Sequence, residues 1–450
     1  MGPKGKHPST GDLFQQPLAD LINLKHPLVK LAELIDWSVF ESRWAEFFPS
    51  RTGRPASSPR LIAGLLYLQH TFACSDEDLI WTWVENPYWQ HFCGETYFQH
   101  EPPIDPSSMT RWRQRVGEEG VEWLLTETIE AARRGKVVKA KSFEKIIVDT
   151  TVMEKAVAYP TDSRLLERAR QHLVKLADTV GITLRQNYNR EAPRLAAQVG
   201  RYAHAKQFRR MNATLKSLRT VVGRVWRDID RKLDRQDEGL SARAVSILAR
   251  VKRLLEQKPK DKNKLYSLHA PEVECISKGK ARQPYEFGVK VTVATTHKEG
   301  LVVGMRSLPG NPYDGHTLPE AIEQVSILTA QKPTAVFVDK GYRGVSVDGV
   351  TIWRSGQKRG VTPSIRKAIH RRSAVEPAIG HMKNEGKLRR NWLKGSLGDA
   401  LNAVLCGAGH NLRMILRAIR LFYVWMLCSL IADTYRAPSR KSESGRLAFS

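Results

Sequence analysis

Two apolar runs rich in β-branched residues, each with one aspartate, have the pattern of buried strands. The first is Ile146-Ile147-Val148-Asp149-Thr150-Thr151-Val152, and in the second, residues 334–342, Asp339 directly follows an apolar stretch. A buried carboxylate needs a partner or a metal, and α/β sheets place their ligands at the carboxyl ends of strands. Singly, each aspartate is typical of a strand end, but together they predict a site on a sheet.

The segment between these runs predicts a hairpin and a helix. Residues 286–294 and 301–308 have the strand pattern, residues 297–300 predict the turn, and a helix is expected near 318–328. Strands and helices in this order predict an α/β fold, a mixed sheet with flanking helices.

Helical patterns dominate the chain before the first strand. Ser58 with Pro59, Ser75 and Ser108 each predict a helix start. Short capped helices joined by polar turns are compatible with a helix-turn-helix DNA reader. The tryptophans of this region are more typical of a core than of a stacking surface: Trp81, Trp83, Trp89 and Trp112.

Helical spacing returns between residues 163 and 265 and near the end of the chain. Leu215, Leu218 and Val222 recur at three- and four-residue spacing, which predicts a helical hairpin or small bundle. Asp162 is expected to cap its first helix. The apolar run 421–432 is too short to cross a bilayer and predicts a buried core helix.

A stretch near residue 376 places one carboxylate among basic side chains. Glu376 and Lys383 lie seven residues apart, about 20° around a helix, and Arg372 precedes Glu376 by about one turn. This set suits a site that holds a cation and a phosphate together. Ser373-x-x-Glu376 is also a capping box, with Ser373 as N-cap and Pro377 in the first turn, so an ordinary helix start is the other interpretation.

Charge points to a polyanionic partner. The 450 residues include 72 Lys plus Arg and 46 Asp plus Glu, a formal charge of +26. Nucleic acid is the first candidate and an anionic membrane surface the alternative. Residues 161–260 alone hold 24 basic and 10 acidic residues, a net charge of +14. This predicts a clamp on the DNA backbone, with a solvated face of a structural insertion as the other interpretation.

The cysteines and the first residues of the chain bear on the cellular compartment and the class of protein. Five cysteines without a C-x-x-C pair argue against a disulfide scaffold and a zinc site, and they indicate a reducing compartment. Residues 1–17 lack the apolar region of a signal peptide, and residues 1–10 are expected to be disordered.

Three motifs in order carry a family resemblance: residues 148–152, residues 338–344, and Arg372-x3-Glu376-x6-Lys383. With them, the sequence resembles the DDE transposases of bacterial insertion sequences, in the group like insertion sequence five, over about residues 11–420. In the wider group the last motif reads Y-x2-R-x3-E-x6-K, and Ile369 stands here where the Tyr would be.

The resemblance implies a fold and a division of the chain. The expected fold is α/β, a ribonuclease H-like mixed-sheet core with a basic helical insertion after its first strand and an all-α N-terminal domain. The expected divisions are a helical DNA-binding domain at 1–140, the first part of the core at 141–162, the insertion at 163–272, the rest of the core with C-terminal helices at 273–433, and a flexible tail at 434–450.

The chemistry expected of the site is phosphoryl transfer. Carboxylates without His or Cys partners select Mg²⁺ or Mn²⁺, and two such ions about 4 Å apart can activate a nucleophile and stabilise a leaving oxygen. The expected ligands are Asp149, bridging both ions, Asp339 and Glu376. Lys383 and Arg372 would neutralise phosphate charge or orient Glu376. Asp314 competes for the site, but its Gly-Pro loop favours a turn role.

By resemblance, the reaction is cleavage at the ends of the element and attack of the freed 3′-hydroxyl on target DNA. The expected partners are double-stranded DNA, as terminal inverted repeats and target, and a second copy of the chain, in the bacterial cytoplasm. DNA contacts are expected from five arginines: Arg54, Arg60, Arg111, Arg113 and Arg343. Two other classes stay open, a metal-dependent nuclease that cuts without joining and a non-catalytic DNA-binding protein.

Overall fold

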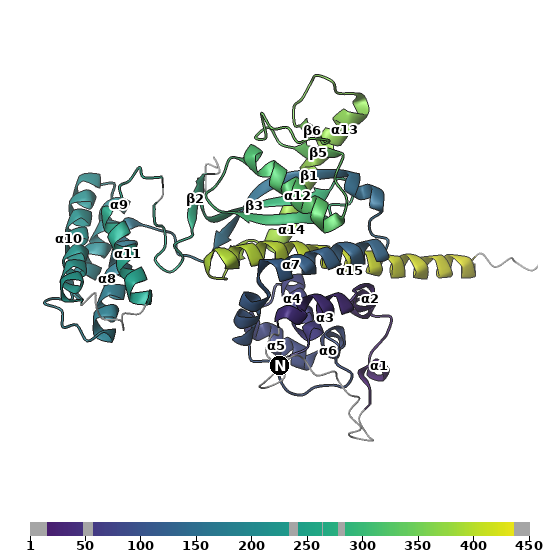
Figure 1. Ribbon diagram of the computed structural model, residues 1–450, viewed down its shortest axis with the longest axis horizontal. Helices are drawn as coiled ribbons and strands as arrows, with labels where there is room; N and C mark the ends of the chain where they lie inside the picture. Colours follow the sequence, from purple (N-terminus) through teal and green to yellow (C-terminus); the bar gives the residue numbers. More distant parts are fainter. Residues whose placement is uncertain (1–15, 48–56, 234–241, 263, 278–283, 436–450) are drawn as a thin grey trace, which may run out of the picture.

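The protein is described by a computed structural model over residues 16–47, 57–233, 242–262, 264–277 and 284–435. The expectations for residues 1–10, for Arg54 and for residues 436–450 lie outside this part of the chain. Figure 1 shows three groups of elements: helices from the N-terminal part, a sheet with its own helices, and a helical lobe beside the sheet.

The N-terminal part of the chain is helical. Its elements are α1 (Leu18–Leu21), α2 (Pro27–Leu34), α3 (Ser38–Arg43), η1 (Trp44–Phe47), α4 (Pro59–Phe72), α5 (Asp76–Glu85), α6 (Pro87–Phe92), α7 (Ser108–Arg134) and η2 (Ala140–Glu144). The Ser58 and Ser75 side chains accept hydrogen bonds at the starts of α4 and α5, which confirms both predicted caps. Ser108 is instead the first residue of α7, because Ser107 occupies the N-cap position.

The tryptophans of the N-terminal helices differ in environment. Trp83, Trp89 and Trp112 are buried, which confirms the core interpretation for these three. Trp81 is 58% exposed on α5 and does not belong to the core.

A sheet forms the centre of the molecule. Its strands are β1 (Lys145–Lys155), β2 (Glu274–Ser277), β3 (Tyr285–Thr296), β4 (Val302–Leu308), β5 (Ala335–Val338), β6 (Thr351–Arg354) and β7 (Arg390–Asn391). The strand order is β2-β3-β1-β5-β6, with β4 paired to β3 and β7 to β1. β1 runs antiparallel to β3 and parallel to β5, so the sheet is mixed, and the predicted strands and hairpin are confirmed.

Helices cover both faces of this sheet or follow its strands. They are η3 (Asp314–Thr317), α12 (Leu318–Thr329), α13 (Pro363–Arg371), η4 (Arg372–Ala374), α14 (Val375–Asn384) and α15 (Gly395–Tyr435). α15 lies between the sheet and the N-terminal helices and packs on α4, α7 and β4 (Figure 1). One hydrophobic core joins all three layers, with Leu66, Val303 and Leu405 among its buried members.

The far part of α15 departs from the predicted buried helix over residues 421–432. Leu421, Phe422 and Val424 are 63%, 58% and 56% exposed, because α15 continues past the helices and strands that cover its first turns (Figure 1). Within the described ranges, none of the helices combines the length and apolar character needed to span a membrane.

The lobe between β1 and β2 consists of α8 (Asp162–Thr179), α9 (Glu191–His204), α10 (Phe208–Lys232) and α11 (Ala242–Glu256). It has a hydrophobic core of its own, to which Leu166, Leu218 and Val251 contribute buried side chains. Thr161, not Asp162, caps α8, since the Thr161 hydroxyl accepts from the Arg164 N–H.

Candidate active site

The two aspartates of the strand motifs lie side by side. β1 and β5 are parallel, with Ile147 opposite Phe337. Asp149 lies two residues further along β1, and Asp339 directly follows Val338, the last residue of β5. Desolvation is the largest cause of the raised pKa of Asp149, and the charge of Asp339 adds to it, so the two carboxylates lie close together although almost two hundred residues separate them.

A small apolar cluster brings the third carboxylate to this face. Ile147 and Phe337 are buried against Val375 at the start of α14, with Ile369 and Ile379 packed around them. The apolar contact holds η4 and α14 against the first half of β1 and the neighbouring β5. The position that carries Tyr in the wider group, Ile369, is thus part of this packing.

Arg372 connects the carboxylates. Its Nη2 lies 2.5 Å from Asp149 Oδ2, and its Nη1 lies 3.7 Å from Glu376 Oε1. The Arg372 and Asp149 side chains are 15% and 13% exposed, whereas the Glu376 side chain is 66% exposed. The contact with Asp149 is therefore a largely desolvated, charge-assisted pair, and the contact with Glu376 is a looser one.

The predicted capping box is wrong. Ala374, not Ser373, is the N-cap of α14, and the Ser373 hydroxyl donates to the His370 carbonyl. α13, η4 and α14 follow one another with helical backbone angles, so Ser373 lacks the extended conformation that an N-cap side chain requires. Pro377 does sit in the first turn of α14, as expected.

Burial perturbs the acid–base properties of this site. Desolvation raises the pKa of Asp149, and the Arg372 guanidinium partly offsets the shift. Tyr342 is fully buried, and burial followed by the charges of Asp149 and Asp314 raises the pKa of its hydroxyl well above the usual value. Among the described residues, no hydrogen-bond partner meets this hydroxyl. A neutral phenol thus lies close to the carboxylates.

Asp314 is a member of the site that the sequence interpretation assigned to a turn. It does begin η3, but its Oδ1 lies 3.1 Å from both Lys290 Nζ and Thr150 Oγ1. A Cβ placed on Gly341 would lie 3.0 Å from Asp339 Oδ1 and 3.4 Å from Asp314 Oδ2. Glycine at position 341 therefore allows the two carboxylates to approach the same backbone. From the sequence, Asp314 was a competitor for the site, but its Gly-Pro loop favoured a turn role.

The other predicted site residues have varied environments. Lys383 lies on α14 at the edge of a cavity between the N-terminal helices and α15, away from the Arg372 contacts. Arg111 and Arg343 are exposed. Arg113 is 4% exposed and pairs with Asp76.

Arg60 also makes internal contacts. Its guanidinium lies over the Trp37 ring, 4.8 Å from the centroid, and donates to the carbonyls of His91 and Phe92. Arg60 and Arg113 thus stabilise the packing of the N-terminal helices in this structure.

The donor set suits a hard divalent cation. Among the residues that the structure describes, no three Asp, Glu, His or Cys side chains are arranged as a metal site. The oxygen-only donors nevertheless fit Mg²⁺ or Mn²⁺, and Arg372 places positive charge between Asp149 and Glu376, where two acidic groups require it. Asp149, Asp339 and Glu376 are the residues that would hold such an ion.

Comparisons with known proteins identify a family. A family model described as a transposase domain matches residues 16–115, and one described as a transposase DDE domain matches residues 257–406. An uncharacterised protein, ORF8 in the nfe locus of Rhizobium meliloti, is 50% identical over 203 residues, which cover 45% of this chain and 98% of that protein. No solved structure matches the chain.

The mixed sheet is consistent with the α/β core of a metal-dependent polynucleotidyl transferase, and the transposase DDE match spans Asp339 and Glu376 but not Asp149. The chain belongs to the DDE transposases of insertion sequences. Its partner is accordingly DNA.

Proposed function

We propose that this protein cuts the ends of an insertion sequence and joins the freed 3′-hydroxyls to target DNA. The observation that carries the proposal is that Arg372 contacts both Asp149 and Glu376, while Asp339 follows β5 close enough for its charge to act on Asp149. The three motifs also favour the group like insertion sequence five and a ribonuclease H-like core, with a homodimer holding the two ends.

In this mechanism the residues of the site have different roles. Asp149, Asp339 and Glu376 would hold the catalytic cations, which when bound would supply Lewis acidity and activate a water or hydroxyl. Arg372 holds the Asp149 carboxylate in one orientation and balances its charge until cation and phosphate arrive. Lys290 restrains Asp314 beside Asp339, and the buried Tyr342 excludes bulk water from that side.

A strand-transfer assay tests the proposal against a nuclease that never joins DNA. The full chain is incubated with Mg²⁺, a supercoiled target plasmid and labelled duplex that carries the inverted repeats found around the gene. We expect label covalently joined to the plasmid through its 3′ end. Cleaved label without joined product would support the nuclease, and intact label would support a non-catalytic DNA-binding protein.

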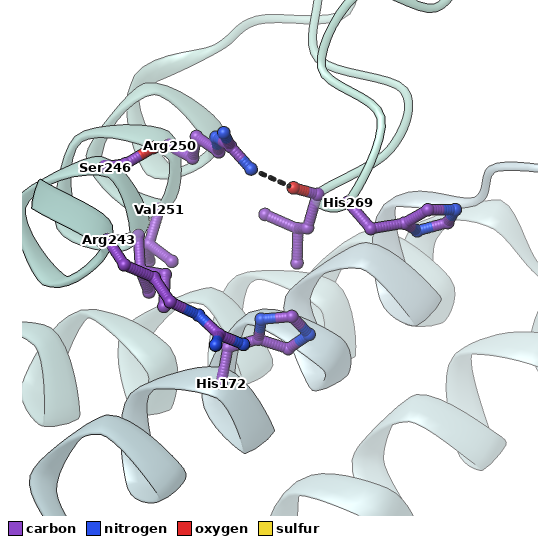
Figure 2. Close-up of a pocket in the computed structure, with 8 residues that line it drawn as sticks. His172, Arg243, Ser246, Arg250, Val251 and His269 are labelled. Carbon is purple, nitrogen blue, oxygen red and sulfur yellow. Dashed lines mark hydrogen bonds between the residues drawn. The ribbon is translucent and has the colours of Figure 1, made fainter. Parts of the chain in front are cut away.

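We assign the lobe of α8–α11 to contact with the DNA backbone. Residues 161–260 carry a net charge of +14. A cavity of about 260 Å³ lies in this lobe, and one of the residues that line it, Arg250, donates to the Leu268 carbonyl. Figure 2 shows the Arg243 and His172 side chains next to each other at this cavity. Acidic side chains do not line this cavity within the described ranges, so an anionic phosphate group suits it.

The salt dependence of DNA binding should report on this lobe. Replacing the exposed Arg209, Arg210 and Arg243 by glutamine should lower the slope of log affinity against log salt by about 0.9 for every phosphate that these side chains neutralise. The measurement is fluorescence anisotropy with duplex DNA at several salt concentrations.

A matched triple variant controls for overall charge. Lys136, Lys139 and Lys141 are exposed residues between α7 and β1, outside the lobe, and their replacement by glutamine removes the same charge. An equal slope in both triple variants would assign the lobe a structural role. The N-terminal helices are proposed as a second DNA contact, through Arg111, and Arg343 as a contact beside Asp339.

A further inference from the structure

A cavity of about 1040 Å³ opens between the N-terminal helices and the C-terminal part of the sheet domain. α4, α5 and α7 form one wall, and α14, β7 and the start of α15 form the other. We call it the α5–β7 groove. Lys383 lines it, and Lys383 follows Glu376 by seven residues on α14, about 10 Å along the helix axis. The groove therefore begins about two helical turns from Glu376.

The two walls of the α5–β7 groove differ in charge. Asp76, Glu77 and Asp78 lie on the α5 wall, and Asp76 is engaged by Arg113. The opposite wall is basic and is contributed by five side chains: Lys383, Lys387, Arg389, Arg390 and Lys394. A polyanion bound along the α14–β7 wall would thus contact cationic side chains. A polyanion bound against α5 would be repelled by the acidic side chains there.

One large aromatic side chain on the basic wall is exposed. Trp392 is 66% exposed, and the Arg390 guanidinium lies 4.9 Å from its ring centroid. The backbone around it is anchored, since β7 pairs with β1 and the buried Asn391 side chain donates to Asp399. A rigidly held, solvent-exposed indole beside cations is the arrangement on which nucleic-acid bases stack.

We infer that the α5–β7 groove binds a single DNA strand that extends from the candidate active site past Lys383, with an unpaired base stacked on Trp392 and the strand phosphates held by Arg389, Arg390 and Lys394. This inference rests on the proposed function and adds a subsite to it. Pockets of about 300–1,000 Å³ hold small-molecule-sized ligands, so this groove accommodates a few nucleotides rather than a duplex. In an intact duplex the base faces are covered by their neighbours, so stacking on Trp392 requires an unpaired nucleotide.

The test compares single-stranded with blunt duplex oligonucleotides, using the full chain in EDTA so that no cleavage occurs. The single strand carries one 2-aminopurine, whose fluorescence is quenched on stacking. Trp392→Ala should weaken single-strand affinity by about 5- to 100-fold and abolish the quenching, while duplex affinity stays unchanged. Trp392→Phe should retain most of both signals because it keeps an aromatic face.

Trp81→Ala is the matched control, because Trp81 is 58% exposed on α5 but does not line the groove. It should leave single-strand binding and quenching unchanged. Two results would overturn the inference: unchanged single-strand binding by a folded Trp392→Ala protein, or an equal loss of single-strand and duplex binding. A changed molecular mass in light scattering together with unchanged DNA binding would instead assign the groove to a protein partner.

The outcome is separable from that of the proposed function. Strand binding in EDTA needs no catalysis, so the groove inference can fail while strand transfer by the unmodified protein succeeds. Conversely, Trp392-dependent quenching without any joined product would support the single-strand subsite and contradict the proposed transposition reaction.

Discussion

Replacing Asp149 by asparagine should lower the rate of DNA cleavage by on the order of 10²-fold or more, because the carboxylate is a preorganised electrostatic group that acts on the transition state. Asp339→Asn and Glu376→Gln should have effects of the same order. The measurement is single-turnover cleavage of labelled DNA in Mg²⁺, with DNA affinity measured in parallel to show that binding survives.

Controls separate a catalytic role from a structural one. Asp149→Asn leaves Arg372 with a weaker partner in a site where its side chain is 15% exposed, so circular dichroism and thermal unfolding must accompany the rates. Asp348→Asn makes the same chemical change at an exposed position after β5 and should cleave at the unmodified rate. Normal cleavage by Glu376→Gln would leave Glu376 as an exposed first-turn residue of α14 with no part in the chemistry.

The second large effect is expected for stability. Lys155, at the end of β1, lies 2.6 Å from Asp399 Oδ1 on α15 and 2.9 Å from Glu272 Oε1 just before β2. The Lys155 and Asp399 side chains are each 5% exposed. This cluster joins both chain connections of the α8–α11 lobe to α15. Lys155→Met should destabilise the protein by about 3–5 kcal/mol, because it leaves the buried Asp399 carboxylate and the partly buried Glu272 carboxylate without their cation.

A second substitution checks the cause. Adding Asp399→Asn to Lys155→Met should recover part of the stability, since the buried negative charge is then removed and the amide can still bond with Asn391. Lys30→Met serves as the surface control, because Lys30 and Glu33 form an exposed pair, and it should leave the urea midpoint unchanged. Equal midpoints for the Lys155 and Lys30 variants would show that the buried cluster adds no stability.

The strands that carry Asp149 and Asp339 could be predicted from the sequence, because strand formation depends mainly on residues that are close together in the chain. Asp149 and Asp339 each follow a short β-branched run, and strand ends are set by neighbouring residues. The same holds for the caps at Ser58 and Ser75, whose partners lie three residues away. The prediction for Ser373 failed on equally local grounds, because the Ser-x-x-Glu pattern does not reveal whether the preceding chain is already helical.

What the sequence could not supply are contacts between distant segments. The Arg372–Asp149 pair joins residues 223 positions apart, and the Thr150–Asp314 contact joins residues 164 apart. Contacts of this kind produce no periodic pattern of residues in the sequence. The interpretation of Asp314 therefore depended on its Gly-Pro loop, which favours a turn. The exposure of Leu421 was missed for a related reason, since an apolar run shows a tendency to be buried but not whether any partner reaches it.

By itself, then, the sequence determined the positions of β1, β3, β4 and β5 and of several helices, the basic character of the segment between β1 and β2, and the three acidic residues predicted as metal ligands. These follow from side-chain periodicity and charge, which are properties of the chain before it folds. Only the tertiary structure decided that Asp149 and Asp339 adjoin, that Arg372 links Asp149 to Glu376, and that Trp392 faces a groove. Those facts depend on strand register and on the packing of α14 and α15, which are set by contacts between segments rather than within them.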